Sequence, residues 1–196
     1  KGSKQTAFFS KYTAPYKYDN FPVAAQAYPQ WMDNLGQKLQ TMLGITKEFN
    51  CCNVNFYAGA DSSLGFHADA EPLFGPRGMS KSIGSVSFGA ERNFAIKRNG
   101  SSYQNVFPLG NGDIISMEGL MQDYFVHALL PADESVGFGF NLTFRHIPYK
   151  AHLNKFDEGM DDDDNGAPPD DDLGPGGNAS DTTIDPCLLY TSPSPR

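Results

Sequence analysis

The sequence predicts a mainly β domain with one flanking helix, arranged as a sandwich or a barrel. Short segments rich in Val, Ile, Phe and Tyr follow one another after residue 48, separated by Gly, Asn and Pro. One stretch before them carries apolar residues at helical spacing instead. The chain has 196 residues, of which 39% are hydrophobic and 13% aromatic, which is enough for one domain with a core.

The first 50 residues divide into two predicted parts. Residues 1–28 are rich in Tyr and interrupted by Pro, which indicates strand and loop. A helix is expected over about 30–43, because apolar side chains recur there at positions Trp31, Leu35, Leu39, Met42 and Leu43. Pro29 suits a first turn and Gly44 a C-terminal stop, whereas Gly36 weakens the helix.

The strands are expected in seven segments, up to about residue 150. They read CCNVNFYAG, SLGFHAD, SIGSVSFGA, RNFAIKR, NVFPLGNGDIISM, YFVHALLP and GFGFNLTFRHI. We therefore expect one domain over residues 1–150, with an N-terminus that is incomplete because the chain begins without Met.

The C-terminal part differs in composition. Residues 151–186 are dominated by Asp, Gly and Pro and predict a disordered acidic tail, without the spacing of an EF-hand. Residues 187–196 resemble a translated sequencing adapter and are interpreted as a non-native scar that takes no part in the fold.

Charge and cysteine content exclude several classes of protein. The net charge of −8 comes from the tail: residues 1–156 hold 14 Lys and Arg against 12 Asp and Glu. A near-neutral body is not a strongly basic nucleic-acid binder, and no apolar run is long enough for a membrane span. Three Cys form neither a zinc motif nor a disulfide framework, which favours an intracellular location, in nucleus or cytoplasm, and we expect a monomer.

The stretch GFHADAEP carries the main chemical signal. On a strand, His67 and Asp69 point to the same side, and Glu71 joins them if the strand continues. His and Asp two residues apart form the compact half of a 2-His-1-carboxylate site for Fe(II). The second His has three candidates, and His127 in the apolar run YFVHALLP is preferred over His146 and His152. A histidine satisfied within the core is the ordinary alternative.

The last predicted strand carries a cation that could pair with an anionic co-substrate of an iron site. Gly139, Asn141, Thr143 and Arg145 share one face of it, and an inward Arg needs a partner such as a carboxylate. Asn55 and Tyr57 share a face ten residues before His67 and can donate hydrogen bonds. Polarity at a strand end is the alternative for these two residues.

Four motifs follow one another along the chain: NFY, then HAD after nine residues, a His after 57 more and NLTFR after thirteen more. In this order and spacing they resemble the AlkB family of Fe(II)/2-oxoglutarate dioxygenases, over about residues 12–149. The resemblance implies a double-stranded β-helix, or jelly roll. It implies that His67, Asp69 and His127 are the catalytic metal ligands, that Asn55, Tyr57, Asn141 and Arg145 hold 2-oxoglutarate, and that Glu71 contacts the substrate base. The implied reaction uses Fe(II), 2-oxoglutarate and O2 to demethylate N-alkylated bases in DNA or RNA, preferably single-stranded.

The sequence departs from the family at one position of the last strand. The family carries Arg six residues before the Arg of NLTFR, whereas this chain has Gly139. Arg92, Lys97 and Arg98 are candidate substitutes, each expected on an exposed strand or turn. Two alternative functions therefore stay open: a catalytically impaired nucleic-acid-binding module on the same fold, and a 2-oxoglutarate oxygenase acting on a protein or small molecule.

Overall fold

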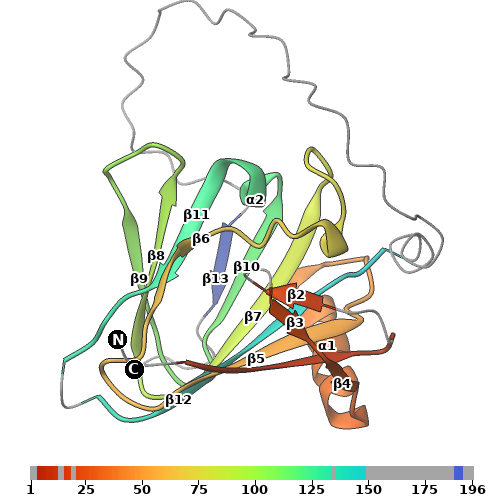
Figure 1. The fold of residues 1–196 in the computed structure, drawn as a ribbon, viewed down its shortest axis with the longest axis horizontal. Coiled ribbons are helices and arrows are strands. Elements are labelled where there is room, and N and C mark those ends of the chain that lie inside the picture. Colours follow the sequence, from red (N-terminus) through yellow and green to blue (C-terminus); the bar gives the residue numbers. More distant parts are fainter. Residues whose placement is uncertain (1–3, 13–15, 19–20, 134–135, 149–187, 192–196) are drawn as a thin grey trace, which may run out of the picture.

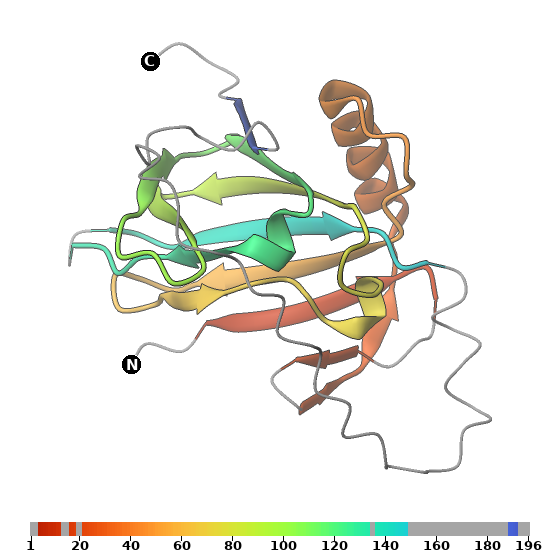
Figure 2. The same cartoon turned by 90° about the horizontal axis from the view of Figure 1, so that it is seen from above.

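The structure, a computed structural model, describes residues 4–12, 16–18, 21–133, 136–148 and 188–191. Two β-sheets face each other (Figure 1), and Figure 2 shows the same layers from above. The larger sheet has the strand order β13-β10-β7-β12-β5-β1-β4 and the smaller one β6-β11-β8-β9. This mainly antiparallel arrangement is the predicted jelly roll.

The larger sheet contains β1 (Gln5–Ser10), β4 (Ala25–Ala27), β5 (Cys51–Tyr57), β7 (Lys81–Gly89), β10 (Ile114–Gly119), β12 (Gly139–Arg145) and β13 (Leu188–Thr191). The smaller sheet contains β6 (Leu64–His67), β8 (Arg92–Arg98), β9 (Asn105–Leu109) and β11 (Phe125–Leu129). A separate pair joins β2 (Tyr16–Tyr18) to β3 (Phe21–Val23). The remaining elements are α1 (Gln30–Leu43), a short 3₁₀-helix η1 (Pro72–Phe74) and α2 (Met121–Tyr124).

Helix α1 confirms the predicted range and packs on the outer face of the larger sheet (Figure 2). Its Met32 and Leu39 are buried against Phe144 and other side chains of the sheet. Gly36 is explained by this packing, because a Cβ there would lie 3.4 Å from the Phe144 ring. Pro29 precedes the helix rather than opening its first turn, and Gly44 ends it in the left-handed conformation.

Successive side chains of β12 point alternately into the hydrophobic core and into a cavity. Leu142 and Phe144 belong to the core cluster beneath α1, whereas Asn141, Thr143 and Arg145 line a cavity on the opposite face. β12 pairs with both β5 and β7, so the three strands carry the polar floor of that cavity together. The period-two pattern of NLTFR therefore places the site residues directly.

The C-terminal segment differs from the expectation. Within residues 187–196, whose interpretation as a non-native scar stays a prediction, Leu188–Thr191 form β13 and pair antiparallel with β10. The physical reason is that β10 would otherwise be a sheet edge with unpaired backbone groups, which accepts another strand readily. The predicted acidic tail, residues 151–186, lies outside the described residues. None of the helices in the described ranges is long and apolar enough to cross a membrane.

Candidate metal and co-substrate site

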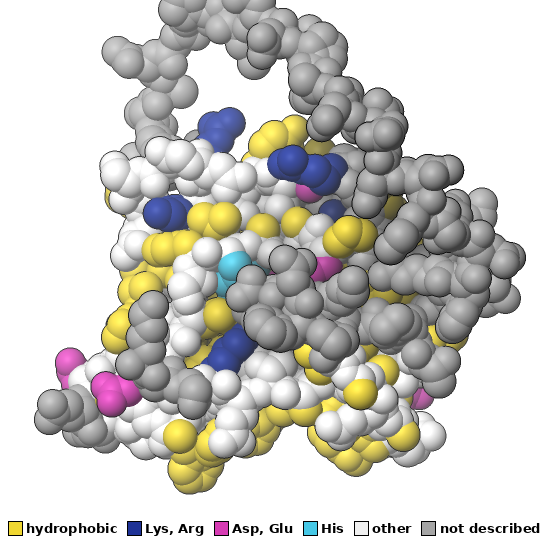
Figure 3. All heavy atoms as spheres, in the orientation of Figure 1, with side chains coloured by type: hydrophobic (Ala, Val, Ile, Leu, Met, Phe, Trp, Pro, Cys, Tyr) yellow, Lys and Arg dark blue, Asp and Glu magenta, His cyan; other side chains and the backbone are white. Residues whose placement is uncertain are grey.

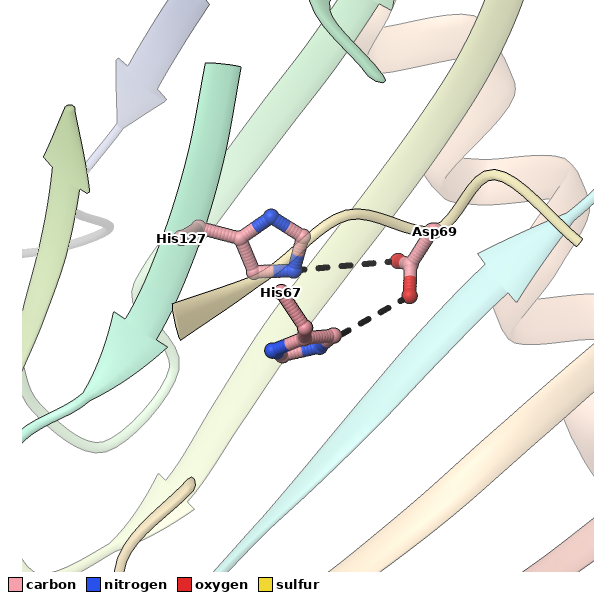
Figure 4. A group of neighbouring side chains, drawn as sticks. All are labelled: His67, Asp69 and His127. Carbon is pink, nitrogen blue, oxygen red and sulfur yellow. Dashed lines mark ion pairs between the residues drawn. The ribbon is translucent and has the colours of Figure 1, made fainter. Parts of the chain in front are cut away.

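Three side chains predicted to bind a metal lie together between the sheets (Figure 4). Nε2 of His67 is 3.8 Å from Oδ1 of Asp69, and Nε2 of His127 is 3.9 Å from Oδ2. The candidate ligand atoms of the three residues all lie within 4.8 Å of one another. Two imidazoles and one carboxylate are the donor set of a non-haem Fe(II) site.

Neighbouring strands set the positions of the two histidines. His67 ends β6 and His127 lies in β11, and the two residues are direct partners in the antiparallel ladder. Their ring centroids are 4.3 Å apart, and Phe94 of β8 stacks on His127 at 5.4 Å. Adjacent strands thus hold two imidazoles side by side, although 60 positions separate the residues in the sequence.

Both imidazoles are suited to metal ligation. Nδ1 of His67 lies 2.9 Å from the carbonyl oxygen of Gly65, which can only accept, so this nitrogen carries the proton and Nε2 keeps its lone pair. Burial lowers the pKa of His127 to about 3, although the charge of Asp69 opposes the shift. His127 is therefore neutral at physiological pH, as a metal ligand must be.

Asp69 is placed by a loop rather than by a strand. β6 ends at His67, so the condition under which Glu71 would share its strand face is not met. The backbone N–H of Asp69 donates to Oε1 of Gln122 at 2.9 Å, and Arg145 donates to Oδ2. Burial would raise the pKa of Asp69, but Arg145 and the two histidines outweigh it and hold that pKa well below its ordinary value.

An open cavity of about 740 Å³ surrounds the metal ligands, a volume that includes solvent at its mouth. All of the residues predicted to hold 2-oxoglutarate line it: Asn55, Tyr57, Asn141 and Arg145. Asn141 donates to Oγ of Ser85 at 2.6 Å and accepts from Thr143 at 2.5 Å, so the polar floor is already ordered by the protein.

The remaining predicted residues fall in different places. Glu71 is partly buried at the start of η1, two residues from Asp69, and does not line the cavity. His146 lies elsewhere, with Nδ1 2.8 Å from the Glu48 carbonyl oxygen, and His152 is outside the described residues. Lys97 and Arg98 do not line the cavity, whereas Arg92 is buried at its wall, so its expected exposure was wrong.

Three residues of the site were missed at the sequence level. Lys4 lines the cavity, and its Nζ lies 3.3 Å from Oδ1 of Asn55; burial lowers the pKa of Lys4 to about 8. No local pattern around Lys4 signals this role. Ser85 was detectable, because it alternates with apolar residues in SIGSVSF, as expected for one polar face of a strand. No feature of the sequence around Gln122 indicates its role, since its contact with Asp69 joins residues 53 positions apart.

Residues 4–145 match the family model described as 2OG-Fe(II) oxygenase superfamily. The chain belongs to this superfamily. Its donor set and polar cavity fit Fe(II) and 2-oxoglutarate, and the chain is an AlkB-like Fe(II)/2-oxoglutarate-dependent dioxygenase.

The curated relatives place this oxygenase near AlkB homologues. It is 30% identical over 145 residues to rat alpha-ketoglutarate-dependent dioxygenase alkB homolog 3, covering 68% of this chain and 47% of that protein. It is 30% identical over 122 residues to Arabidopsis thaliana DNA oxidative demethylase ALKBH2, covering 50% and 38%. It is also 26% identical to uncharacterized protein R406 of Acanthamoeba polyphaga mimivirus, covering 74% and 73%. The alignments thus span less than half of the two named AlkB homologues.

Among solved structures, the fold resembles that of a protein described as OsALKBH1. The TM-score is 0.53 at 16% identity, and the match covers 74% of this chain and 81% of that chain. At this identity the likeness concerns the fold alone, and it agrees with the facing sheets seen in Figure 1.

Proposed function

We propose that this oxygenase removes N-methyl groups from bases in single-stranded DNA or RNA, such as 1-methyladenine or 3-methylcytosine. The observation that carries the proposal is the position of Glu71, a carboxylate two residues after the metal ligand Asp69, at the start of η1. Although Glu71 is not among the residues that line the cavity, its carboxylate is an acceptor that suits the exocyclic amine of an adenine or cytosine. The similarity to a protein named DNA oxidative demethylase supports the same substrate class.

The chain's own residues would divide the work. His67, Asp69 and His127 would hold the iron, and the polar floor carrying Asn55 and Asn141 would orient 2-oxoglutarate. Iron, 2-oxoglutarate and O2, when bound, supply the oxidation of the N-methyl carbon, whose hydroxylated product releases formaldehyde. Arg145 keeps Asp69 ionised and in position throughout. Extracting the target base is cheapest from a single strand, which is why that substrate is proposed.

The surface is compatible with a polyanion without being strongly basic. Figure 3 shows Lys and Arg side chains distributed around a histidine on one face, with apolar patches between them. Lys97 lies 4.3 Å from the Phe66 ring, and Tyr103 and Tyr124 are each more than half exposed. Cations and exposed aromatic rings are the groups that bind single strands without reading sequence. We also propose that the protein is intracellular and monomeric.

The test is a demethylation assay with mass spectrometry. Wild type, Glu71→Gln and the matched control Glu91→Gln, at an exposed position, are compared on single-stranded and duplex oligonucleotides carrying 1-methyladenine or 3-methylcytosine, as DNA and as RNA. We expect demethylation of single strands by wild type and control, and a loss of about tenfold or more for Glu71→Gln, the usual value of a hydrogen bond to a charged group.

Two outcomes would favour the alternatives instead. Salt-dependent binding of the oligonucleotides without turnover, despite bound metal, would indicate an impaired binding module. Succinate formation with neither binding nor demethylation would indicate a protein or small-molecule substrate.

A further inference from the structure

Arg92 is a buried cation in the wall of the cavity, at the end remote from Arg145. It opens β8, and only 4% of its surface is exposed. Its guanidinium carbon lies 5.6 Å from the centroid of the Tyr57 ring. Tyr57 pairs with Gly139 at the first residue of β12, whereas Arg145 is the last residue of that strand. The cavity therefore has one buried Arg toward each end of β12.

The charge of Arg92 has no carboxylate partner within the described ranges. Its Nη1 donates to the carbonyl of Gly59 at 3.2 Å, and Nη2 donates to the carbonyls of Ser62 and Leu130. Its Nε is buried and has no hydrogen-bond partner among the described residues. A guanidinium carries five N–H donors, so carbonyl contacts hold the side chain in place while leaving donors and a full positive charge. Burying such a charge without an anion is costly.

The distance to the metal ligands suits a five-carbon dicarboxylate. Leu130, whose carbonyl accepts from Arg92, follows His127 by three residues, about 10 Å at the usual rise of an extended chain. A metal bond of about 2 Å, a hydrogen bond of about 3 Å and a five-carbon chain together reach about this length. Arg145, by contrast, already donates two hydrogen bonds to Asp69.

We propose that Arg92 binds the carboxylate of 2-oxoglutarate that lies farther from the metal. The bare backbone at Gly139 is consistent with this arrangement. A Cβ there would lie 3.3 Å from the Phe88 carbonyl oxygen and 3.4 Å from that of Ala90, so a side chain entering from this position is crowded. The cation comes from the facing sheet instead, and Gly139 need not abolish binding of the co-substrate.

The test measures binding without turnover and without nucleic acid. The protein is loaded with Mn(II) in place of iron, and its affinity for 2-oxoglutarate and for 2-oxopentanoate is measured by calorimetry. These acids share the metal-binding end and the chain length, but the second carries a methyl group instead of the far carboxylate. Wild type, Arg92→Gln, Arg92→Lys and the exposed control Arg98→Gln are compared.

We expect wild type and Arg98→Gln to prefer 2-oxoglutarate by about 10- to 100-fold, the usual value of hydrogen bonds to a charged group. Arg92→Gln should lose this preference by weakening 2-oxoglutarate alone, and Arg92→Lys should retain part of it. Equal weakening of both acids, which a purely structural role for Arg92 would cause, would overturn the proposal, as would an unchanged preference.

The variants distinguish a loss of folding from a loss of 2-oxoglutarate binding. If Arg92→Gln does not fold, Arg92→Lys decides with the same two acids, because it keeps the charge but loses the planar fork. A selective loss for 2-oxoglutarate supports the proposal, and an equal loss or no loss overturns it. Since no base is present, failure of the proposed demethylation leaves this result unaffected, and failure here leaves the substrate class untouched.

Discussion

Arg145 donates two hydrogen bonds to the same oxygen of Asp69, from Nη2 at 2.5 Å and from Nε at 3.2 Å. Both side chains are buried, so the pair attracts strongly and fixes the carboxylate relative to His67 and His127. The assignment of Arg145 to 2-oxoglutarate stays a prediction, but its partner in the structure is the metal ligand Asp69. β12 thus supports the metal site through the contact of Arg145 with Asp69.

Removing Arg145 should destabilise the protein. In Arg145→Gln, Asp69 keeps a buried charge without its cation, which costs about 3–5 kcal/mol of the free energy of unfolding. Urea denaturation of the metal-free protein measures this, with the exposed Arg98→Gln as control, expected within about 0.5 kcal/mol of wild type. A wild-type midpoint for Arg145→Gln would contradict the account of the pair.

The same pair predicts a pH dependence of stability. The pKa of Asp69 is depressed in the folded protein, so the stabilisation is present above its unfolded pKa of about 3.9 and is lost as the pH falls toward the folded value. The difference in unfolding free energy between wild type and Arg145→Gln should therefore shrink progressively below about pH 4. A difference that stays constant from pH 7 to pH 3 would show that Asp69 is not stabilised in its ionised form.

Within the part of the chain that the structure describes, the three clustered residues should form the metal site. His67→Ala, Asp69→Ala and His127→Ala should each abolish one-to-one binding of Mn(II), measured by calorimetry. His146→Ala is the matched control, because His146 lies outside the cluster, with Nδ1 against the Glu48 carbonyl oxygen. Loss of binding in His146→Ala with the fold intact would mean that the cluster is not the metal site.

Gln122 should act on the metal through Asp69. Its Oε1 accepts from the Asp69 backbone N–H, and its amide lies 3.7 Å from the sulfur of Met117. Gln122→Leu should lower Mn(II) affinity by about 10- to 100-fold, as is typical for groups that orient a ligand. The exposed Gln104→Leu is the control. An unchanged metal affinity in Gln122→Leu would show that the loop around Asp69 is held by other contacts.

Cys51 and Cys52 should be inert in the native protein. Both are fully buried; burial raises the pKa of Cys51 to about 12 and that of Cys52 well above its usual value. Since the thiolate is the reactive form, iodoacetamide at pH 8 should modify neither thiol until the protein is unfolded. Peptide mass spectrometry of native and denatured samples checks this, and rapid native modification of either residue would contradict the burial.

Much of the fold was predictable because its local patterns agree with its packing. The alternation in NLTFR marks one buried face and appears where predicted, and the helix covers the predicted range 30–43. Its predicted apolar face is only partly right, because Leu39 is buried but Trp31 and Met42 are exposed, and Met32 takes a buried place instead. His127 is predictable because an imidazole is unusual within an apolar strand. The structure places His127 beside His67.

What the sequence did not predict depends on long-range contacts. Arg92 opens a predicted strand at a position expected to be exposed, but three carbonyls from other segments accept its hydrogen bonds and it is buried. β6 stops at His67, so Asp69 is held by Gln122 and Arg145 and not by strand geometry. The pairing of β13 depends on the open edge of β10, which no pattern in residues 187–196 reveals.

The most direct test of the central claim counts two products in one reaction. Wild-type protein with Fe(II), ascorbate, 2-oxoglutarate and O2 is given single-stranded oligonucleotide with or without 1-methyladenine, and succinate and formaldehyde are both quantified. The account predicts equal amounts of the two products, dependent on the methyl group and absent in His67→Ala. Succinate that is indifferent to the methylated base, with no formaldehyde, would contradict it.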